Sequence, residues 1–194
     1  MRRRTFDLIV SSVGALLTVF LLVVGGLAMW GYSFANSSVH DQLAAQQIYF
    51  PAVGSDALKS PEIGPYLNKY AGQQLTTGAQ AEAYADHFIA VHLKEVAGGQ
   101  TYAQVSAKAQ ADPANTQLQA QVNTLFKGET LRGMLLNAYA FWKVGQIALY
   151  AGIAAFVGAA VMALLTVLGF RHVRRTSSDA ELFEKHQEPA VNAV

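Results

Sequence analysis

The chain contains no cysteine, which removes several classes of function at once. Without thiols it forms no disulfide, no thiolate metal site, no cysteine-ligated iron–sulfur cluster and no haem attachment of the C-x-x-C-H type. It also lacks the glycine-rich phosphate loop and the G-x-S-x-G nucleophile motif. We therefore expect no catalytic site, no cofactor and no small-molecule substrate.

Charged residues are scarce, at 14% of the chain, and the formal net charge is only +1. The basic residues gather at the two ends and form no broad basic face, which argues against a nucleic-acid partner. Hydrophobic residues make up 52%, and the mean hydropathy is +0.23. This composition is typical of a small membrane protein with one modest polar domain.

Two long stretches have no charged side chain. One lies between Asp7 and Asp41, and its apolar part ends at Trp30. The other covers residues 144–170 and also lacks histidine. About 20 apolar residues cross the hydrocarbon core as a helix, and only helices or closed barrels satisfy their backbone there. We therefore predict transmembrane helices at 8–31 and 144–170, both in contact with membrane lipid.

The first apolar run also has features of a signal peptide, with small residues at Gly26 and Ala28 where cleavage would occur. The run is longer than a usual signal-peptide core, however. It ends in Trp30 and Tyr32, which suit the outer membrane interface. We predict that it remains as an uncleaved anchor.

The flanking charges predict the orientation. Three arginines lie in the tail 1–7 and three more in the tail 171–194. Since positive charge is retained on the cytoplasmic side, both tails should be cytoplasmic. The intervening segment 32–143 holds seven Lys/Arg and eight Asp/Glu, with no dense basic cluster, and should lie outside. The expected location is the bacterial plasma membrane.

The central segment carries helix signals and no strand alternation of useful length. Thr77-x-x-Gln80 and Thr101-x-x-Gln104 are capping boxes, and Gly98-Gly99 ends the helix that the first one opens. Pro65 begins a single short helix that Gly72 closes. The predicted fold is therefore an all-α membrane protein, with a small helical extracytoplasmic domain inserted between two transmembrane helices.

Two boundaries in this domain depend on weaker signals. Asp112-Pro113 reads as the start of a helix through Phe126, with Gly128 as its end. From Glu129 an unbroken pattern leads into the second membrane helix. For the first membrane helix two alternatives stay open, since it either continues outward past Tyr32 or is followed by a separate short helix capped near Ser38.

A metal site of two histidines and one carboxylate would have to use the histidines of the central segment. His87 and His92 are near Asp86 and Glu95, and His40 lies further away in sequence. Residues five apart lie about 140° apart around a helix, whereas ligand pairs usually use spacings of three or four. Neither apolar run contains a histidine that could bind haem b. We expect no metal site.

Small residues recur along the two predicted membrane helices and allow close helix packing. They support two interpretations: the two helices pack on each other, or they dock onto a larger membrane complex. The candidates are Gly14, Thr18, Ala151, Ala155, Gly158, Ala159 and Ala163.

Two segments carry a resemblance to a known family. They are VHDQLAAQQIYFPAVGSDALKSPEIGPYLNKYAGQQLTTGAQAEAYADHFIAVHLKEVAGG and FKGETLRGMLLNAYAFW. Here the chain resembles the actinobacterial respiratory supercomplex association factors, two-helix proteins of mycobacteria and their relatives. The resemblance implies a non-catalytic accessory subunit. Its partners would be cytochrome bcc and the haem-copper oxidase, which together pass electrons from menaquinol to oxygen. It transfers no individual functional residue.

Under this interpretation the aromatic residues of the outer domain are candidates for contacts with the larger subunits. The alternative roles are the domain's own core or the interfacial aromatic belt. The candidates are Tyr49, Phe50, Tyr66, Tyr70, Tyr139, Phe141 and Trp142.

Two other classes of function remain open. One is a membrane sensor with an outer ligand-binding domain, which is disfavoured because only about 24 residues follow the second membrane helix. The other is a metal-dependent oxygenase, which bound iron in the purified chain would support.

Overall fold

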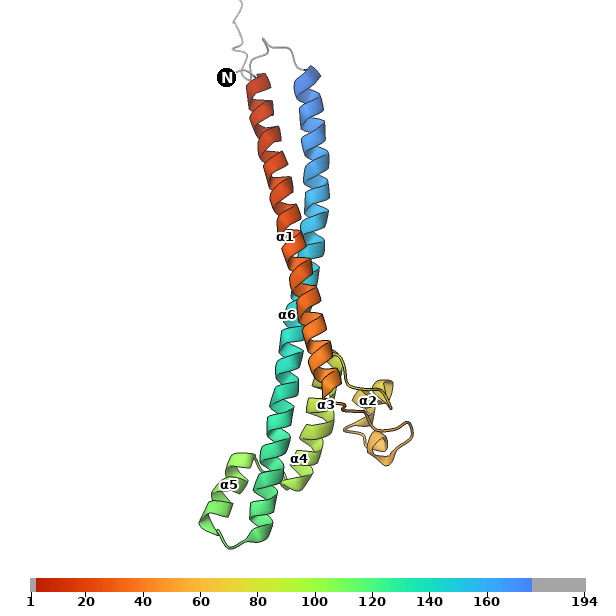
Figure 1. Cartoon of the computed structure of the whole chain (residues 1–194), viewed down its shortest axis with the longest axis vertical. Coiled ribbons are helices and arrows are strands. Elements are labelled where there is room, and N and C mark those ends of the chain that lie inside the picture. Colours follow the sequence, from red (N-terminus) through yellow and green to blue (C-terminus); the bar gives the residue numbers. More distant parts are fainter. Residues whose placement is uncertain (1–2, 176–194) are drawn as a thin grey trace, which may run out of the picture. The chain divides into compact units, whose positions relative to one another are not determined.

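The computed structural model describes residues 3–175, and this part of the chain is helical with no strand (Figure 1). One isolated antiparallel bridge joins Tyr49 and Gln74. The elements in chain order are α1 (Arg3–Ala45), η1 (Asp56–Lys59), α2 (Gly64–Leu67), η2 (Asn68–Tyr70), α3 (Gly78–Tyr84), the π-helical turn η3 (Ala85–Ile89), α4 (Ala90–Val96), α5 (Tyr102–Ala111) and α6 (Thr116–Arg175).

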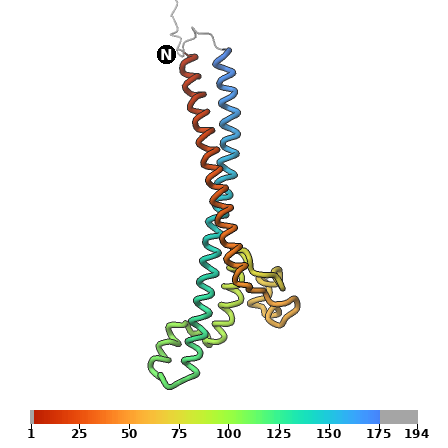
Figure 2. The backbone as a smooth tube through the Cα atoms, viewed as in Figure 1, coloured from red at the N-terminus to blue at the C-terminus, as the bar shows by residue number. Residues whose placement is uncertain are grey.

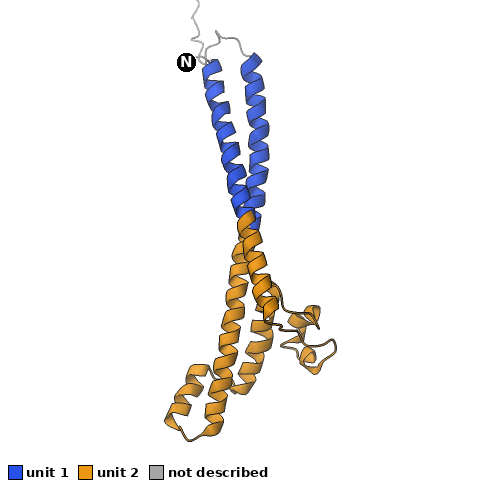
Figure 3. Cartoon of the chain, in the orientation of Figure 1, with its two compact units in different colours: residues 1–29, 149–194 blue, residues 30–148 orange. Residues whose placement is uncertain are grey.

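The chain divides into two compact units (Figure 3). Unit 1 combines residues 1–29 with residues 149–194, and unit 2 is the continuous segment 30–148. The long helices α1 and α6 each contribute to both units.

Unit 1 is an antiparallel pair of helices, as the residues that face each other show. Ser11 lies against Gly169, Thr166 against Gly14, and Phe156 against Gly25. The residue numbers rise along α1 as they fall along α6, so the two helices run antiparallel. In each of these pairs a glycine of one helix meets a side chain of the other. Glycine in the seam allows close approach of the two backbones.

The two long helices are apolar enough to cross a membrane. Their most apolar 18-residue windows have mean hydropathies of 2.6 in α1 and 2.4 in α6, and only 17% and 11% of these windows are buried. The core helix of a soluble protein would be mostly buried, so this exposure favours a lipid or protein environment outside the chain. The predicted transmembrane character is supported at this level.

Helix α1 continues well past Tyr32, which resolves one of the open alternatives. It ends at Ala45 and carries Val39 and Leu43, each 4% exposed, into the core of unit 2. Gln47 then adopts a positive φ of 52°, a left-handed conformation suited to leaving a helix. No separate helix begins near Ser38.

Both predicted capping boxes are present. The Thr77 hydroxyl accepts from the Gln80 amide N–H, and the Gln80 side chain accepts from the Thr77 N–H. Thr101 and Gln104 do the same at the start of α5. The segment that begins after Thr77 ends where it was expected, since Gly98 and Gly99 take positive φ values of 56° and 78°.

Every fourth residue of the segment 78–97 is buried. This row consists of Ala81, Ala85, Ile89, Leu93 and Ala97, each no more than 7% exposed. In a regular α-helix a spacing of four drifts by about 40° per step. The π-helical turn η3, which holds part of the row, turns the chain less per residue and keeps the row facing the core.

The predicted start of the last helix at Asp112-Pro113 is wrong. Asp112 instead closes α5, since its N–H donates to the Lys108 carbonyl, and α6 begins at Thr116. The Asn115 side chain caps α6 by accepting from the Leu118 N–H at 3.1 Å. Asp112 and Asn115 are both of residue types that cap the N-terminus of a helix. Because the chain turns between them, Asn115 is the one that caps α6.

The predicted helix end at Gly128 is also wrong, because α6 continues through it to Arg175. The Leu93 side chain of α4 occupies the place where a Cβ of residue 128 would stand. This glycine therefore serves helix packing and does not terminate the helix. Pairing of Leu93 with a residue 35 positions away leaves no local sequence signal.

The connection between α1 and α3 is a packed loop (Figure 2). Its two ends pair through Leu75 N–H to Ile48 O at 2.8 Å and Phe50 N–H to Gln73 O at 2.9 Å. Phe50 is 3% exposed and anchors the loop in the core. The short helix predicted at Pro65 is present as α2 and η2.

Candidate interaction surfaces

The small-residue candidates lie largely in the seam of unit 1. Ala155 and Ala159 are 9% and 1% exposed. A Cβ added at Gly14 would lie 2.6 Å from Thr166 Oγ1, and one at Gly158 would lie 3.5 Å from Leu21. Close packing within the chain thus uses most of this face, as the first of the two interpretations expects.

The remaining candidates are placed differently. Thr18 is half-buried and donates to the Gly14 carbonyl at 2.8 Å, so its hydroxyl is satisfied by its own helix. Ala163 is half-buried, and Ala151 is exposed. Ala151 is therefore the member of the set that points away from the seam.

Large apolar side chains cover the outward faces of unit 1. On α1, Leu16 is 72% exposed and Phe20 61%; on α6, Val157 and Leu164 are each 61% exposed. Uncovered apolar area of this extent does not persist in water. Any partner or lipid of unit 1 meets mainly these branched and aromatic side chains, because most of the small-residue candidates are buried in the seam.

The aromatic candidates of unit 2 separate into two groups. Phe50 is buried, with its ring 5.2 Å from that of Tyr70. Trp142 is half-buried and fills the space next to Gly78 of α3, and Tyr139 is half-buried and stacks beside it at 6.1 Å. These four residues hold unit 2 together.

The other three aromatic candidates are exposed. Tyr49, Tyr66 and Phe141 have exposed fractions of 59%, 46% and 43%. Tyr66 stacks face to face on His87, with the ring centroids 3.4 Å apart, and Phe141 lies edge-on to Phe34. These three are the most exposed of the seven and are the best placed to meet a partner.

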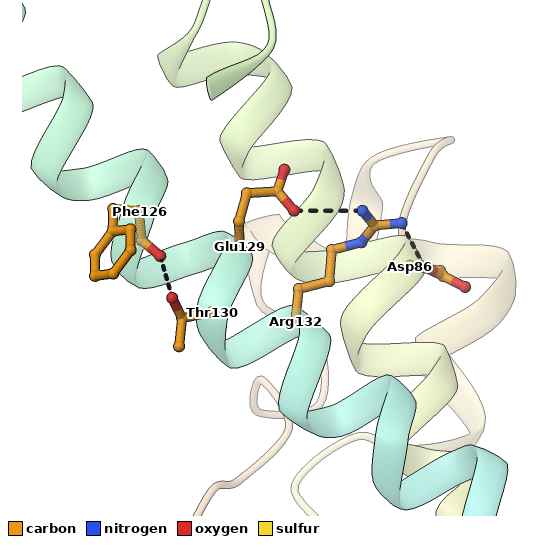
Figure 4. A network of polar contacts seen from close by, with 5 residues as sticks. All are labelled: Asp86, Phe126, Glu129, Thr130 and Arg132. Carbon is orange, nitrogen blue, oxygen red and sulfur yellow. Dashed lines mark hydrogen bonds and ion pairs between the residues drawn. The ribbon is translucent and has the colours of Figure 1, made fainter. Parts of the chain in front are cut away.

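Arg132 of α6 is the centre of a polar network in unit 2 (Figure 4). Its guanidinium donates to Asp86 at 2.9 Å and lies 3.5 Å from Glu129. The hydrogen bond to Asp86 is the main reason that the pKa of Arg132 is raised, and partial burial opposes it. Because Asp86 belongs to the π-helical turn, this pair ties η3 to α6.

A shallow pocket of about 440 Å³ adjoins the π-helical turn. Asp86 and His87 line it together with Glu62 and Lys94, whose charged atoms lie 3.6 Å apart. π-helical turns often mark functional positions. Here the charges of both signs are already paired with each other, and the ring of His87 is stacked on Tyr66.

The histidines do not converge. His92 Nδ1 lies 2.7 Å from the Phe88 carbonyl, His87 stacks on Tyr66, and His40 is beside Asp41. Within residues 3–175 no group of three or more His, Asp or Glu side chains is placed to hold a metal ion.

A second pocket, of about 460 Å³, lies between α1 and α6 in unit 2. The wall from α1 consists of Val39, Gln42, Leu43 and Gln46, and the wall from α6 of Leu131, Met134, Asn137, Ala138 and Phe141. We call this pocket the α1–α6 groove. No ionisable side chain lines it.

Of the groove residues, the sequence prediction included only Phe141. The missed signal is the row Leu131, Met134, Ala138 and Phe141, which follows the alternating three-and-four spacing of a coiled-coil seam. The two walls are about 90 positions apart in the sequence, so their meeting could not be foreseen.

Comparison with models of known protein families, with curated proteins and with solved structures gives no match for this chain.

Proposed function

We propose that the chain is a non-catalytic accessory subunit of a bacterial respiratory complex. It would assemble or stabilise the supercomplex of cytochrome bcc and an aa3-type haem-copper oxidase in the plasma membrane. Both termini would be cytoplasmic, and unit 2 would lie outside the membrane. The two segments that resemble the actinobacterial association factors motivate the choice of these partners.

One observation about the surface carries the proposal. Several small residues of unit 1, among them Gly14, Gly25 and Ala159, pack within its own helix pair, and yet both helices still expose large apolar side chains such as Phe20 and Leu164. The anchor is therefore already paired within the chain and still offers side chains suited to contact with lipid and with other membrane subunits.

Unit 2 supports the same function from outside the anchor. Its core includes the buried Leu67, Leu75 and Leu125, each no more than 2% exposed, so it is a packed domain and not a loose linker. It also exposes Phe141, Met134 and the α1–α6 groove. A folded domain with an apolar surface is what a subunit that bridges larger proteins requires.

Purification of the tagged full-length chain from native membranes in mild detergent tests the proposal. The eluate is analysed by haem difference spectra and by mass spectrometry. We expect b-, c- and a-type haem signals and oxidase subunits at near-stoichiometric yield. A colourless, solitary protein, under conditions in which the supercomplex stays intact, would refute the proposal.

A further inference from the structure

We infer that the α1–α6 groove binds one uncharged, amphipathic α-helix of a partner membrane protein, at the point where that helix continues outward from the bilayer. The inference rests on the proposed membrane anchoring and adds to it a defined contact site.

The spacing of the walls fits a helix. Leu131, Met134, Ala138 and Phe141 alternate steps of three and four along α6. On α1, Val39, Gln42 and Gln46 follow the same alternation. Two such rows beside one groove form the holes into which the side chains of a third helix pack. The rows span 8 and 11 residues, about 11 to 15 Å, so two to three turns would be covered.

The exposed fractions of the lining residues show that the groove is formed and that its α6 wall is uncovered. Val39 and Leu43 on the α1 wall are each 4% exposed. Met134, Phe141 and Leu131 on the α6 wall are 66%, 43% and 37% exposed. The neighbouring face of α6 is covered, because Leu135 is 2% exposed and Arg132 is engaged by Asp86.

The chemistry of the lining restricts the occupant. The central segment has 15 Lys, Arg, Asp and Glu residues, but none of them lines the groove. The polar groups present are the amides of Gln42, Gln46 and Asn137. A charged partner would lose hydration without finding a counter-charge. The complementary surface is apolar, with neutral hydrogen-bonding groups at its edges.

The outer end of the groove, at Leu43 and Leu131, argues against a lipid chain, whereas Phe141 at its inner end lies only three residues before Val144. Leu43 lies 13 residues beyond Trp30, and Leu131 lies 13 residues before Val144, where the apolar runs end. Along a helix this is about 20 Å. The headgroup layer extends only roughly 5–8 Å beyond the hydrocarbon core. Acyl chains therefore do not reach this part of the groove, whereas a helix that extends out of the membrane does.

A second copy of the chain fits less well. A symmetric dimer through this face would oppose groove to groove, that is, two concave surfaces. The convex surface of a single helix fills such a groove, and close packing requires that it be filled.

Site-specific photocrosslinking in native membranes tests the inference. A benzoylphenylalanine replaces Leu131, Met134 or Ala138 in the full-length chain, and Gly133 or Ala140 in the controls, which are exposed on other faces of α6. We expect at least tenfold more adduct from the groove positions. The adducts should map to residues three or four apart in one uncharged stretch next to a membrane helix of a single partner.

Three results would overturn the inference: a dimer of the chain, an adduct with phospholipid, or equal yields at groove and control positions. A second pair of variants, Met134→Lys and Gly133→Lys, checks the chemistry. With the benzoylphenylalanine at Leu131 or Ala138, Met134→Lys should lower the yield of the crosslinked partner at least tenfold while helix content stays unchanged. Gly133→Lys should not lower it, and equal effects of the two variants would also contradict the inference.

Failure of the inference can be told apart from failure of the proposed function. If haem-containing subunits co-purify but the groove positions give no helix adduct, the groove inference is wrong and the function stands. If no haem-containing subunit co-purifies and the adducts map to a helix of another membrane protein, the function is wrong and the groove inference stands.

Discussion

Gly14 of α1 and Thr166 of α6 face each other in the seam of unit 1, and a Cβ at residue 14 would lie 2.6 Å from the threonine Oγ1. Thr166 is 9% exposed, and its hydroxyl has no hydrogen-bond partner among the described residues. The fit of the two helices is therefore steric, with space left by glycine for a side chain of the other helix. This matching makes the seam sensitive to single methyl groups.

The first prediction compares two adjacent glycines of α1, of which Gly25 lies in the seam and Gly26 does not. A Cβ at Gly25 would lie 3.0 Å from the Phe156 ring, whereas one at Gly26 would meet nothing within 4 Å. Gly25→Leu should destabilise the helix pair by about 1–3 kcal/mol through overpacking. Gly26→Leu is the matched control and should not destabilise it. Thermal unfolding of the full-length chain in detergent, followed by circular dichroism, measures both, and equal melting temperatures would contradict the predicted seam.

The second prediction applies the same logic to unit 2. Gly128 packs against Leu93, while a Cβ at Gly133 of the same helix would have nothing within 4 Å. Gly128→Leu should cost about 1–3 kcal/mol by separating α4 from α6. Gly133→Leu should instead stabilise the helix by about 0.5–1 kcal/mol, because leucine is the better helix former. Chemical denaturation of the two variants should show opposite shifts of the midpoint.

The third prediction concerns the pair of Asp86 and Arg132. Both side chains are about one-third exposed, at 34% and 33%, so solvent screens their interaction. Asp86→Asn should lower the free energy of unfolding by about 1 kcal/mol. Glu129→Gln removes the longer contact of 3.5 Å and should have a smaller effect. A double-mutant cycle with Arg132→Met measures the coupling, and a coupling of zero would show that the pair does not fasten η3 to α6.

The fourth prediction tests the orientation in the membrane. Because the chain has no cysteine, one introduced thiol gives a clean label. Val53→Cys, at a position 83% exposed in unit 2, should react with a membrane-impermeant maleimide in intact cells. Arg174→Cys, at an exposed position near the C-terminal end of α6, should react only after permeabilisation. The reverse pattern would invert the proposed topology.

Local signals in the sequence were sufficient for much of the fold. The capping boxes at Thr77 and Thr101 work through residues three positions apart, and they were predicted correctly. The apolar runs likewise predicted two long helices. Such features depend on neighbouring residues or on bulk composition, which a sequence displays directly.

The error at Gly128 occurred where a distant contact decides the outcome. Gly128 looks like a helix end in isolation, and only the presence of Leu93 explains why it lies within α6. Phe50 and Tyr49 are adjacent aromatics of similar appearance, yet one is 3% and the other 59% exposed. Their roles depend on which of them turns toward Tyr70 and Tyr84.

The candidate site was the least predictable part. The α6 wall of the groove has a readable spacing, but a row of this kind is equally suited to an internal core. Its openness follows from the positions of η3 and α4, which contact α6 at Arg132 and Gly128 and leave Met134 uncovered. Which face of α6 is covered depends on contacts between residues far apart in the sequence, such as Leu93 with Gly128.

The π-helical turn η3 has a consequence for how this segment tolerates changes in length. Such a turn corresponds to one extra residue taken up within an α-helix, because the five residues of the wider turn rotate the chain about as much as four α-helical residues do. Deletion of a single residue between Ala85 and Ile89 would restore a regular helix and leave α4 in nearly the same rotational phase relative to α3. Leu93 would then still face Gly128, and Gly78 would still meet Trp142. We therefore expect the five residues of η3 to accept the loss of one residue, in contrast to the regular helix on either side, where a deletion would rotate all that follows by roughly 100°.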